Sequence, residues 1–326
     1  MLRLSIATEL YDRTAALHDG RVRPEGIEAT WLALNVEQTF WRMLQHREFD
    51  VSELSLASYA IRRDQGHTDL VALPVYLSRT FRHDCIYVNA DAGIREPKDL
   101  LGRRMGVPEY QITAAVFARG LLSDDFGVAP ADLHWFQGGL EEPGRVPHTK
   151  VDPPVPIEKI PNDKTLARML EDGEIDALIS PRVPSTFKSG SGKVVRLFPD
   201  PWSVARDYFT RTAIFPIMHL VVVRSEIVDA NPWVPQTLSK AFLAAKRIAD
   251  ANLRETAALP ISLPFLVQHA EETATLMGAD FWPYGVEPNR PTLEAFTRYA
   301  HEQGLIGTRP DIEELFPEST QRVSRL

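Results

Sequence analysis

Apolar residues recur along the chain with the spacing of a strand in some segments and with the spacing of a helix in the segments between them. Short apolar runs predict strands over residues 4–8, 27–34, 49–54 and 70–75. An amphipathic spacing predicts a helix over 36–46, and Ser55 is placed to cap another helix that runs through residue 61. Strands that alternate with helices are typical of an α/β fold with a mainly parallel sheet.

A second α/β series follows the first. Strands are predicted over 85–88, 104–107, 133–136 and 175–180, and helices over 113–124 and 165–171. The segment 138–161 is rich in proline, glycine and charge, which predicts a long surface loop. An apolar run over 213–223 predicts a strand that returns to the first series, and a helix over 234–253 opens a mostly helical remainder.

This order of elements predicts two lobes joined by two strand-like crossings, with the ligand bound in a cleft between them. Residues 1–85 and 215–326, with the C-terminal helices, form lobe I, and residues 86–214 form lobe II. In open α/β sheets, ligands bind beyond the carboxyl ends of the strands. That rule selects the candidate residues below.

Composition narrows the function classes. The net charge of −8 over 326 residues disfavours a nucleic-acid or anionic-membrane partner. No window reaches the roughly 18 apolar residues that span a bilayer. Cys85 is the single cysteine, so no intrachain disulfide forms. With no leader pattern before the first strand, we expect a cytoplasmic protein.

The segment that leads into residues 85–88 carries Arg79, Arg82 and His83. Two guanidiniums and an imidazole are costly to desolvate without an anionic partner, and arginine pairs with carboxylates through two parallel hydrogen bonds. A small acid is therefore the expected ligand. The alternative is a solvated strand entry with surface arginines.

Further polar residues follow other predicted strands. They are Tyr11, Arg13, Glu53, Ser55, Tyr110, Thr113 and Arg182. Thr113 offers a hydroxyl and free N–H groups at a helix start, or is a plain cap. Arg182 binds a carboxylate or forms a surface ion pair. Glu53 takes part in proton transfer or pairs with a neighbouring arginine.

His219 lies within an apolar run, either as a hydrogen-bonded core residue or at the floor of the cleft. Its side chain is suited to proton transfer near neutral pH. The sequence has no glycine-rich nucleotide motif, no Cys/His cluster with zinc spacing and no Gly-x-Ser-x-Gly motif. We therefore expect proton-transfer chemistry on a bound acid, with no cofactor and no metal.

Nine segments spread over the chain resemble the 4,5-dihydroxyphthalate decarboxylase family. They are residues 11–14, 49–55, 78–83, 107–114, 138–145, 173–179, 214–219, 231–233 and 281–285. The resemblance implies a type II periplasmic-binding-protein-like fold, a cytoplasmic carboxy-lyase and a small aromatic dicarboxylate as substrate. Ala213, where the family pattern has glycine, and the segment 146–156 depart from it.

The resemblance implies the conversion of 4,5-dihydroxyphthalate to protocatechuate. This reaction needs a base near a phenol, an acid near the ring carbon that bears the leaving carboxylate, and cations for the other carboxylate. Arg79, Arg82 and Arg182 are expected to hold carboxylates, while His219 and Glu53 share the proton transfer in an unassigned order. His83 is the reserve candidate for this proton transfer.

Two other functions stay open on the sequence. One is a cytoplasmic or exported solute-binding protein for an aromatic acid, and the other is a different lyase or dehydratase on the same fold. An amphipathic segment over residues 292–303 would serve either a homo-oligomer or packing within the chain.

Overall fold

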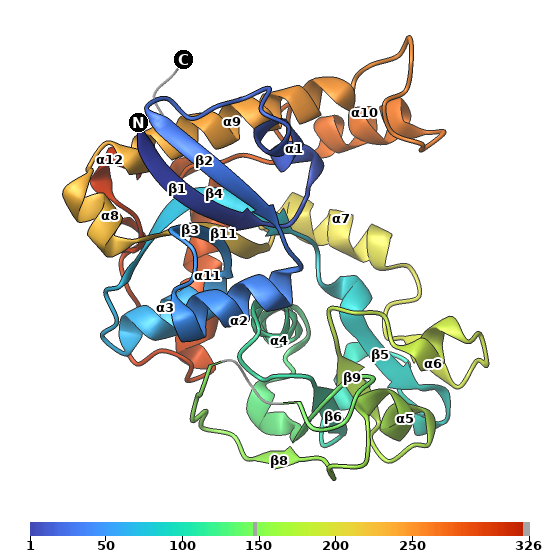
Figure 1. Cartoon of the computed structure of the whole chain (residues 1–326). Coiled ribbons are helices and arrows are strands. Elements are labelled where there is room, and N and C mark those ends of the chain that lie inside the picture. Colours follow the sequence, from blue (N-terminus) through green and yellow to red (C-terminus); the bar gives the residue numbers. More distant parts are fainter. Residues whose placement is uncertain (146–148, 322–326) are drawn as a thin grey trace. The chain divides into compact units, whose positions relative to one another are not determined.

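A computed structural model describes residues 1–145 and 149–321 (Figure 1). The chain folds into two compact units. Unit 1 holds Met1–Arg79, Ile217–Leu293 and the segment from Pro310 onward, and unit 2 holds Thr80–Pro216 and Glu294–Arg309. Each unit contains one mixed sheet, so the predicted α/β class is confirmed.

The sheet of unit 1 has the strand order β2-β1-β3-β11-β4. The strands are β1 Leu2–Thr8, β2 Ile27–Ala33, β3 Val51–Ser55, β4 Leu70–Arg79 and β11 Ile217–Arg224. β1 pairs in parallel with β2 and β3, whereas β11 runs antiparallel between β3 and β4. Every residue of β3 is buried, because this strand is covered on both faces.

Helices cover both faces of this sheet, with α1 and α9 packed together on one face and α2 and α3 on the other (Figure 1). The helices of unit 1 are α1 Asp12–His18, α2 Val36–His46, α3 Leu56–Asp64, α8 Ser225–Ala230, α9 Val234–Asn252, α10 Leu266–Met277 and α12 Glu318–Gln321. The Asn35 side chain caps α2, and the Ser55 hydroxyl caps α3 as predicted, by accepting from the N–H of Ser58.

The sheet of unit 2 has the order β10-β5-β9-β6-β7-β8. The strands are β5 Ile86–Asn89, β6 Arg104–Val107, β7 His134–Gln137, β8 Ile157–Lys159, β9 Ala177–Ile179 and β10 Val194–Arg196. The helices are α4 Thr113–Phe126, α5 Leu166–Glu171, α6 Ser185–Lys188 and α7 Pro201–Thr212, and α11 Arg290–Glu302 enters from unit 1. No helix within the described ranges is long and apolar enough to cross a membrane.

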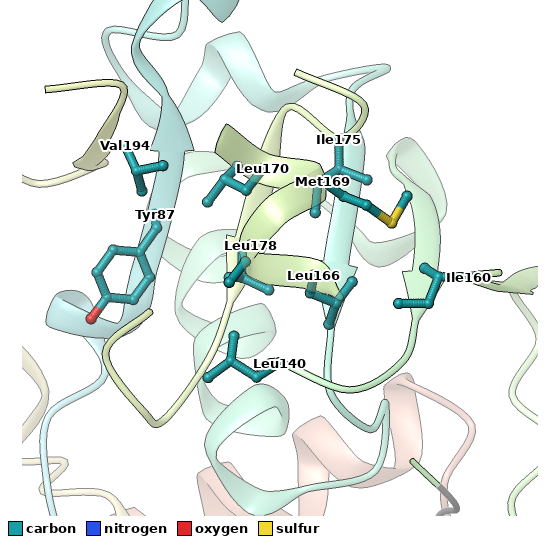
Figure 2. Packing of buried hydrophobic residues seen from close by; sticks show 10 residues of the cluster. Tyr87, Leu140, Ile160, Leu166, Met169, Leu170, Ile175, Leu178 and Val194 are labelled. Atoms are coloured by element: carbon teal, nitrogen blue, oxygen red, sulfur yellow. The ribbon is translucent and has the colours of Figure 1, made fainter. Parts of the chain in front are cut away.

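An apolar core fills the space between α5 and the sheet of unit 2. Figure 2 shows Leu166 and Leu170 of the helix close to Leu178 of β9. Gly106 on β6 makes this approach possible, because a Cβ atom there would lie 2.6 Å from the Cδ1 atom of Ile175. The core therefore depends on a glycine within the strand as well as on its apolar side chains.

The observed elements differ from the predicted ones mainly at short helices and at the second crossing. α1, α7 and α8 were not predicted, and the strand expected over 213–223 begins only at Ile217, because α7 extends to Thr212 and ends at Ala213 with φ 54°. The long loop predicted over 138–161 contains β8. Its residues 146–148 lie outside the described part of the chain.

The two units divide the chain differently from the expected lobes. Residues 80–85, 215–216 and 294–309, all expected in lobe I, belong to unit 2. For residues 294–309, the reason is packing of α11 on α4. Phe296 and Tyr299 contact Phe117, with ring centroids 5.9 and 6.0 Å apart. This packing within the chain accounts for the apolar face of the amphipathic segment 292–303.

Gly120 tests this packing, because a Cβ atom there would lie 2.4 Å from the ring of Tyr299. Alanine is the better helix former by about 1 kcal/mol, yet overpacking costs typically about 1–3 kcal/mol. We expect Gly120→Ala to lower the free energy of unfolding in urea titrations. The cost should shrink in a Tyr299→Leu background, and an equal cost in both backgrounds would contradict the proposed contact.

Candidate active site

Glu53 on β3 is a carboxylate with no solvent exposure at all. Its Oε1 atom accepts hydrogen bonds from the Tyr11 hydroxyl and from Nδ1 of His219, both at 2.7 Å. Its Oε2 atom accepts from the backbone N–H of Glu9 at 3.2 Å. Three donors satisfy this buried group, two from the segment between β1 and α1 and one from β11, as a charged oxygen in an apolar interior requires.

The register of the sheet brings His219 to Glu53. On β11, His219 stands opposite Ser55 and Val221 stands opposite Glu53, so the imidazole reaches the carboxylate diagonally on the same face. With its proton on Nδ1, the His219 ring donates to the Glu53 carboxylate. Nε2 of the neutral ring then holds a lone pair and can act as a base.

The imidazole remains in contact with solvent, with 18% of its side chain exposed, while Glu53 behind it is sealed. Phe40 of α2 packs edge-on against the ring, with centroids 4.8 Å apart. The arrangement resembles the carboxylate–imidazole pairs of hydrolytic triads, in which the buried acid orients the ring.

Tyr11 contacts the Glu53 carboxylate directly, and Arg13 packs against the Tyr11 ring. Burial, followed by the charge of Glu53, raises the pKa of the Tyr11 hydroxyl, so it stays a proton donor to the carboxylate. The Arg13 guanidinium lies 4.1 Å from the centre of the Tyr11 ring and 4.4 Å from that of Trp282. Its Nε donates to the carbonyl of Leu77 at 2.8 Å, which ties α1 to β4.

Arg79, predicted to hold a substrate carboxylate, has partners within unit 1. Its Nη1 donates to Oδ1 of Asn289 at 2.7 Å and to the carbonyl of Pro283 at 3.3 Å. The residue is 6% exposed, and burial lowers the pKa of its guanidinium to about 9. Arg79 thus connects β4 to the segment that precedes α11.

In unit 2, Arg82 and His83 are buried where the chain enters a short 3₁₀ turn. Burial lowers the pKa of Arg82. The His83 ring packs against Phe198 and Tyr208, with centroids 5.7 and 5.1 Å away, and neither ring nitrogen has a hydrogen-bond partner among the described residues. Burial lowers the pKa of His83 to about 4, so the ring stays neutral near pH 7.

The other candidates of unit 2 differ widely in exposure. Tyr110 is fully buried, with the Arg119 guanidinium 3.6 Å from its ring centre. Thr113 is buried as the first residue of α4, and the N-cap position belongs to Ile112. Arg182 is exposed just after β9. Of these three residues, Arg182 is the exposed one.

Sequence reasoning passed over a buried polar group beside Tyr110. Glu109 is 1% exposed and accepts from Nε of Arg145 and Nε2 of Gln111, each at 2.8 Å. The rule that selected Tyr110 and Thr113 from this strand end applies equally to Glu109 and Gln111. Within the described ranges, no group of three or more His, Cys, Asp or Glu side chains is arranged to hold a metal ion.

The neutral state of His83 makes stability depend on pH. The unfolded chain binds a proton at this residue near pH 6.5, whereas the folded chain binds it only near pH 4, so stability falls as the pH drops through this window, by at most about 3 kcal/mol. We expect His83→Phe to reduce the loss of unfolding free energy between pH 7 and pH 4.5 in urea titrations. His134→Gln, at an exposed position, is the control, and an unchanged loss in His83→Phe would contradict this account.

Solved structures similar to this chain share its fold at low sequence identity. A periplasmic sulfonate-binding protein of Methylobacillus flagellatus gives a TM-score of 0.57 at 15% identity, covering 97% of this chain and 92% of that one. The aliphatic sulphonate-binding protein of Escherichia coli gives 0.55 at 13% identity, covering 97% of both chains. These likenesses confirm the expected periplasmic-binding-protein-like α/β fold.

Curated relatives are far more similar in sequence, although no protein-family model matches the chain. A 4,5-dihydroxyphthalate decarboxylase of Pseudomonas putida is 42% identical over 210 residues, which cover 64% of this chain and 81% of that protein. Another, of Comamonas testosteroni, is 40% identical over 317 residues, 97% of this chain and 96% of that protein. With this identity over nearly its whole length, the chain belongs to the 4,5-dihydroxyphthalate decarboxylase family.

Proposed function

We propose that this protein is a carboxy-lyase that converts 4,5-dihydroxyphthalate to protocatechuate and CO2 by proton transfer. The observation that carries the proposal is the imidazole of His219, partly exposed and held through Nδ1 by the buried carboxylate of Glu53. The names of the two curated relatives supply the substrate class. A base of this kind matches what an activated phenol requires.

The proposed reaction begins at the ring hydroxyl para to the leaving carboxylate. Nε2 of His219 takes its proton, and the electrons of the oxygen move toward the para carbon, which accepts a solvent-derived proton. The bond from this carbon to the carboxylate then breaks, its electron pair restores the aromatic ring, and CO2 leaves. The phenolate finally recovers its proton from His219, so one proton is consumed overall.

Glu53 has a positioning role in this proposal. Its oxygens already accept from Tyr11, His219 and Glu9, and it has no exposed surface with which to touch a substrate. It keeps the proton of the neutral ring on Nδ1 and stabilises the imidazolium that forms when Nε2 accepts a second proton. The proton transfer expected of both residues thus falls to His219.

The spectator carboxylate needs a cation. The carboxylate-binding roles of Arg182 and Arg82, which lie in unit 2, stay predictions from the sequence. Arg79 is assigned instead to its contacts with Asn289 and Pro283. We also propose a cytoplasmic location, which suits a chain whose single cysteine, Cys85, is buried and forms no disulfide.

Turnover by the purified protein tests the function. We expect CO2 and protocatechuate in equal amounts from 4,5-dihydroxyphthalate, and one deuterium on the ring of the product when the reaction runs in D2O. Tight binding of the acid without release of CO2 would overturn the proposal in favour of a solute-binding protein. A product without ring deuterium would overturn the proton-transfer step.

Variants of His219, Glu53 and Tyr11 test the roles assigned to these residues. His219→Gln should lower kcat on the order of 10²–10⁴-fold, the usual contribution of a general base. Glu53→Gln should lower kcat less, and Tyr11→Phe less again, because each leaves Nε2 in place. His67→Gln, at an exposed position, is the control. Near-full turnover in His219→Gln would remove this residue from the mechanism.

A further inference from the structure

The pairing of β4 with β11 changes register on both sides of His219, once between Val221 and His219 and again between His219 and Ile217. Residues Leu70–Leu73 pair regularly with Arg224–Val221, but the next pairing joins Ser78 to His219. Residues 74–77 of β4 therefore stand opposite Leu220 alone, as a bulge in the strand. Bulges bend a strand and redirect its side chains, often next to an active site.

Groups outside the strand satisfy the carbonyls of this bulge. The carbonyl of Pro74 accepts from the N–H of Gly285, and that of Tyr76 accepts from Nε1 of Trp282, both at 2.8 Å. The carbonyl of Leu77 accepts from Nε of Arg13 at the same distance. Because these three carbonyls have donors, the bulge is a fixed part of the fold.

The bulge sets Ser78 directly across from His219. Side chains of directly opposed residues lie on the same face, with Cβ atoms roughly 4.5–5.5 Å apart. The Ser55 hydroxyl on the other side of His219 accepts from the N–H of Ser58. The Ser78 hydroxyl is partly exposed and makes no hydrogen bond within the described part of the chain.

We propose that Ser78 determines specificity for a catechol-type acid by hydrogen bonding to the second of its two adjacent ring hydroxyls. The inference rests on the proposed function, in which His219 takes the proton of the first. Two polar side chains at neighbouring positions on β11 and β4 suit two oxygens on neighbouring ring carbons. A ring with one hydroxyl leaves Ser78 without a ligand.

The test compares kcat/KM for 4,5-dihydroxyphthalate and 4-hydroxyphthalate. Ser78→Ala should lose roughly 10–100-fold on the dihydroxy acid, the range for one hydrogen bond to a polar or charged group, and less than about 3-fold on the monohydroxy acid. Ser78→Thr keeps a hydroxyl and should recover most of the loss. Ser191→Ala, at an exposed position of unit 2, should match the wild type on both acids.

If 4-hydroxyphthalate reacts too slowly to measure, inhibition constants for the two products, protocatechuate and 3-hydroxybenzoate, provide the same comparison. Equal losses on both ligands, or no loss on the dihydroxy acid, would overturn the role of Ser78 while the proposed function stands. A wild-type protein that turns over neither acid would overturn the proposed function and this inference with it.

Discussion

The burial of the Glu53 carboxylate constrains the rest of unit 1. A charge without solvent contact is tolerated only when hydrogen-bond donors replace the water it has lost. Those donors come from Glu9, Tyr11 and His219, so the segment between β1 and α1 must meet β3, and so must β11. A shift of β11 by one residue would move His219 to the other face of the sheet and remove a donor. The electrostatic need thus helps to fix the register.

The burial of Glu53 also separates two roles in the proposed mechanism: Glu53 orients the imidazole, and His219 transfers the proton. A carboxylate whose oxygens are occupied and sealed can hold an imidazole, and in the proposed mechanism the exposed edge of that imidazole meets the substrate. The sulfonate-binding proteins that resemble this chain share its fold alone, at 15% and 13% identity. Because one fold carries many functions, catalysis has to come from particular side chains placed on it. In unit 1, we propose the imidazole of His219, with the buried carboxylate behind it, as that addition.

The sequence predicted local features well and long-range ones poorly. The helix Val36–His46, the strand Arg104–Val107 and the Ser55 cap follow from nearby residues, and the structure confirms them. The Glu53–His219 contact joins residues 166 positions apart, which no local pattern encodes. The carboxylate-binding role predicted for Arg79 and the proton-transfer role predicted for His83 both required side chains that a ligand can reach at a strand end. Asn289 is a partner of Arg79, and Phe198 covers His83, and both come from distant segments.

Pro74 illustrates how a local signal acquires its meaning from distant partners. A proline inside an apolar run disfavours regular pairing, because it has no N–H to donate, and such residues are found at strand edges or bulges. The aromatic segment 281–285, one of the segments that resemble the family, supplies Trp282 and Gly285 as donors to the carbonyls of the bulge. These donors stabilise the irregular strand. In a regular strand, a residue of β4 other than Ser78 would stand opposite His219. A substrate contact at Ser78 requires this irregularity, so the proline, the aromatic segment and the imidazole form one structural unit.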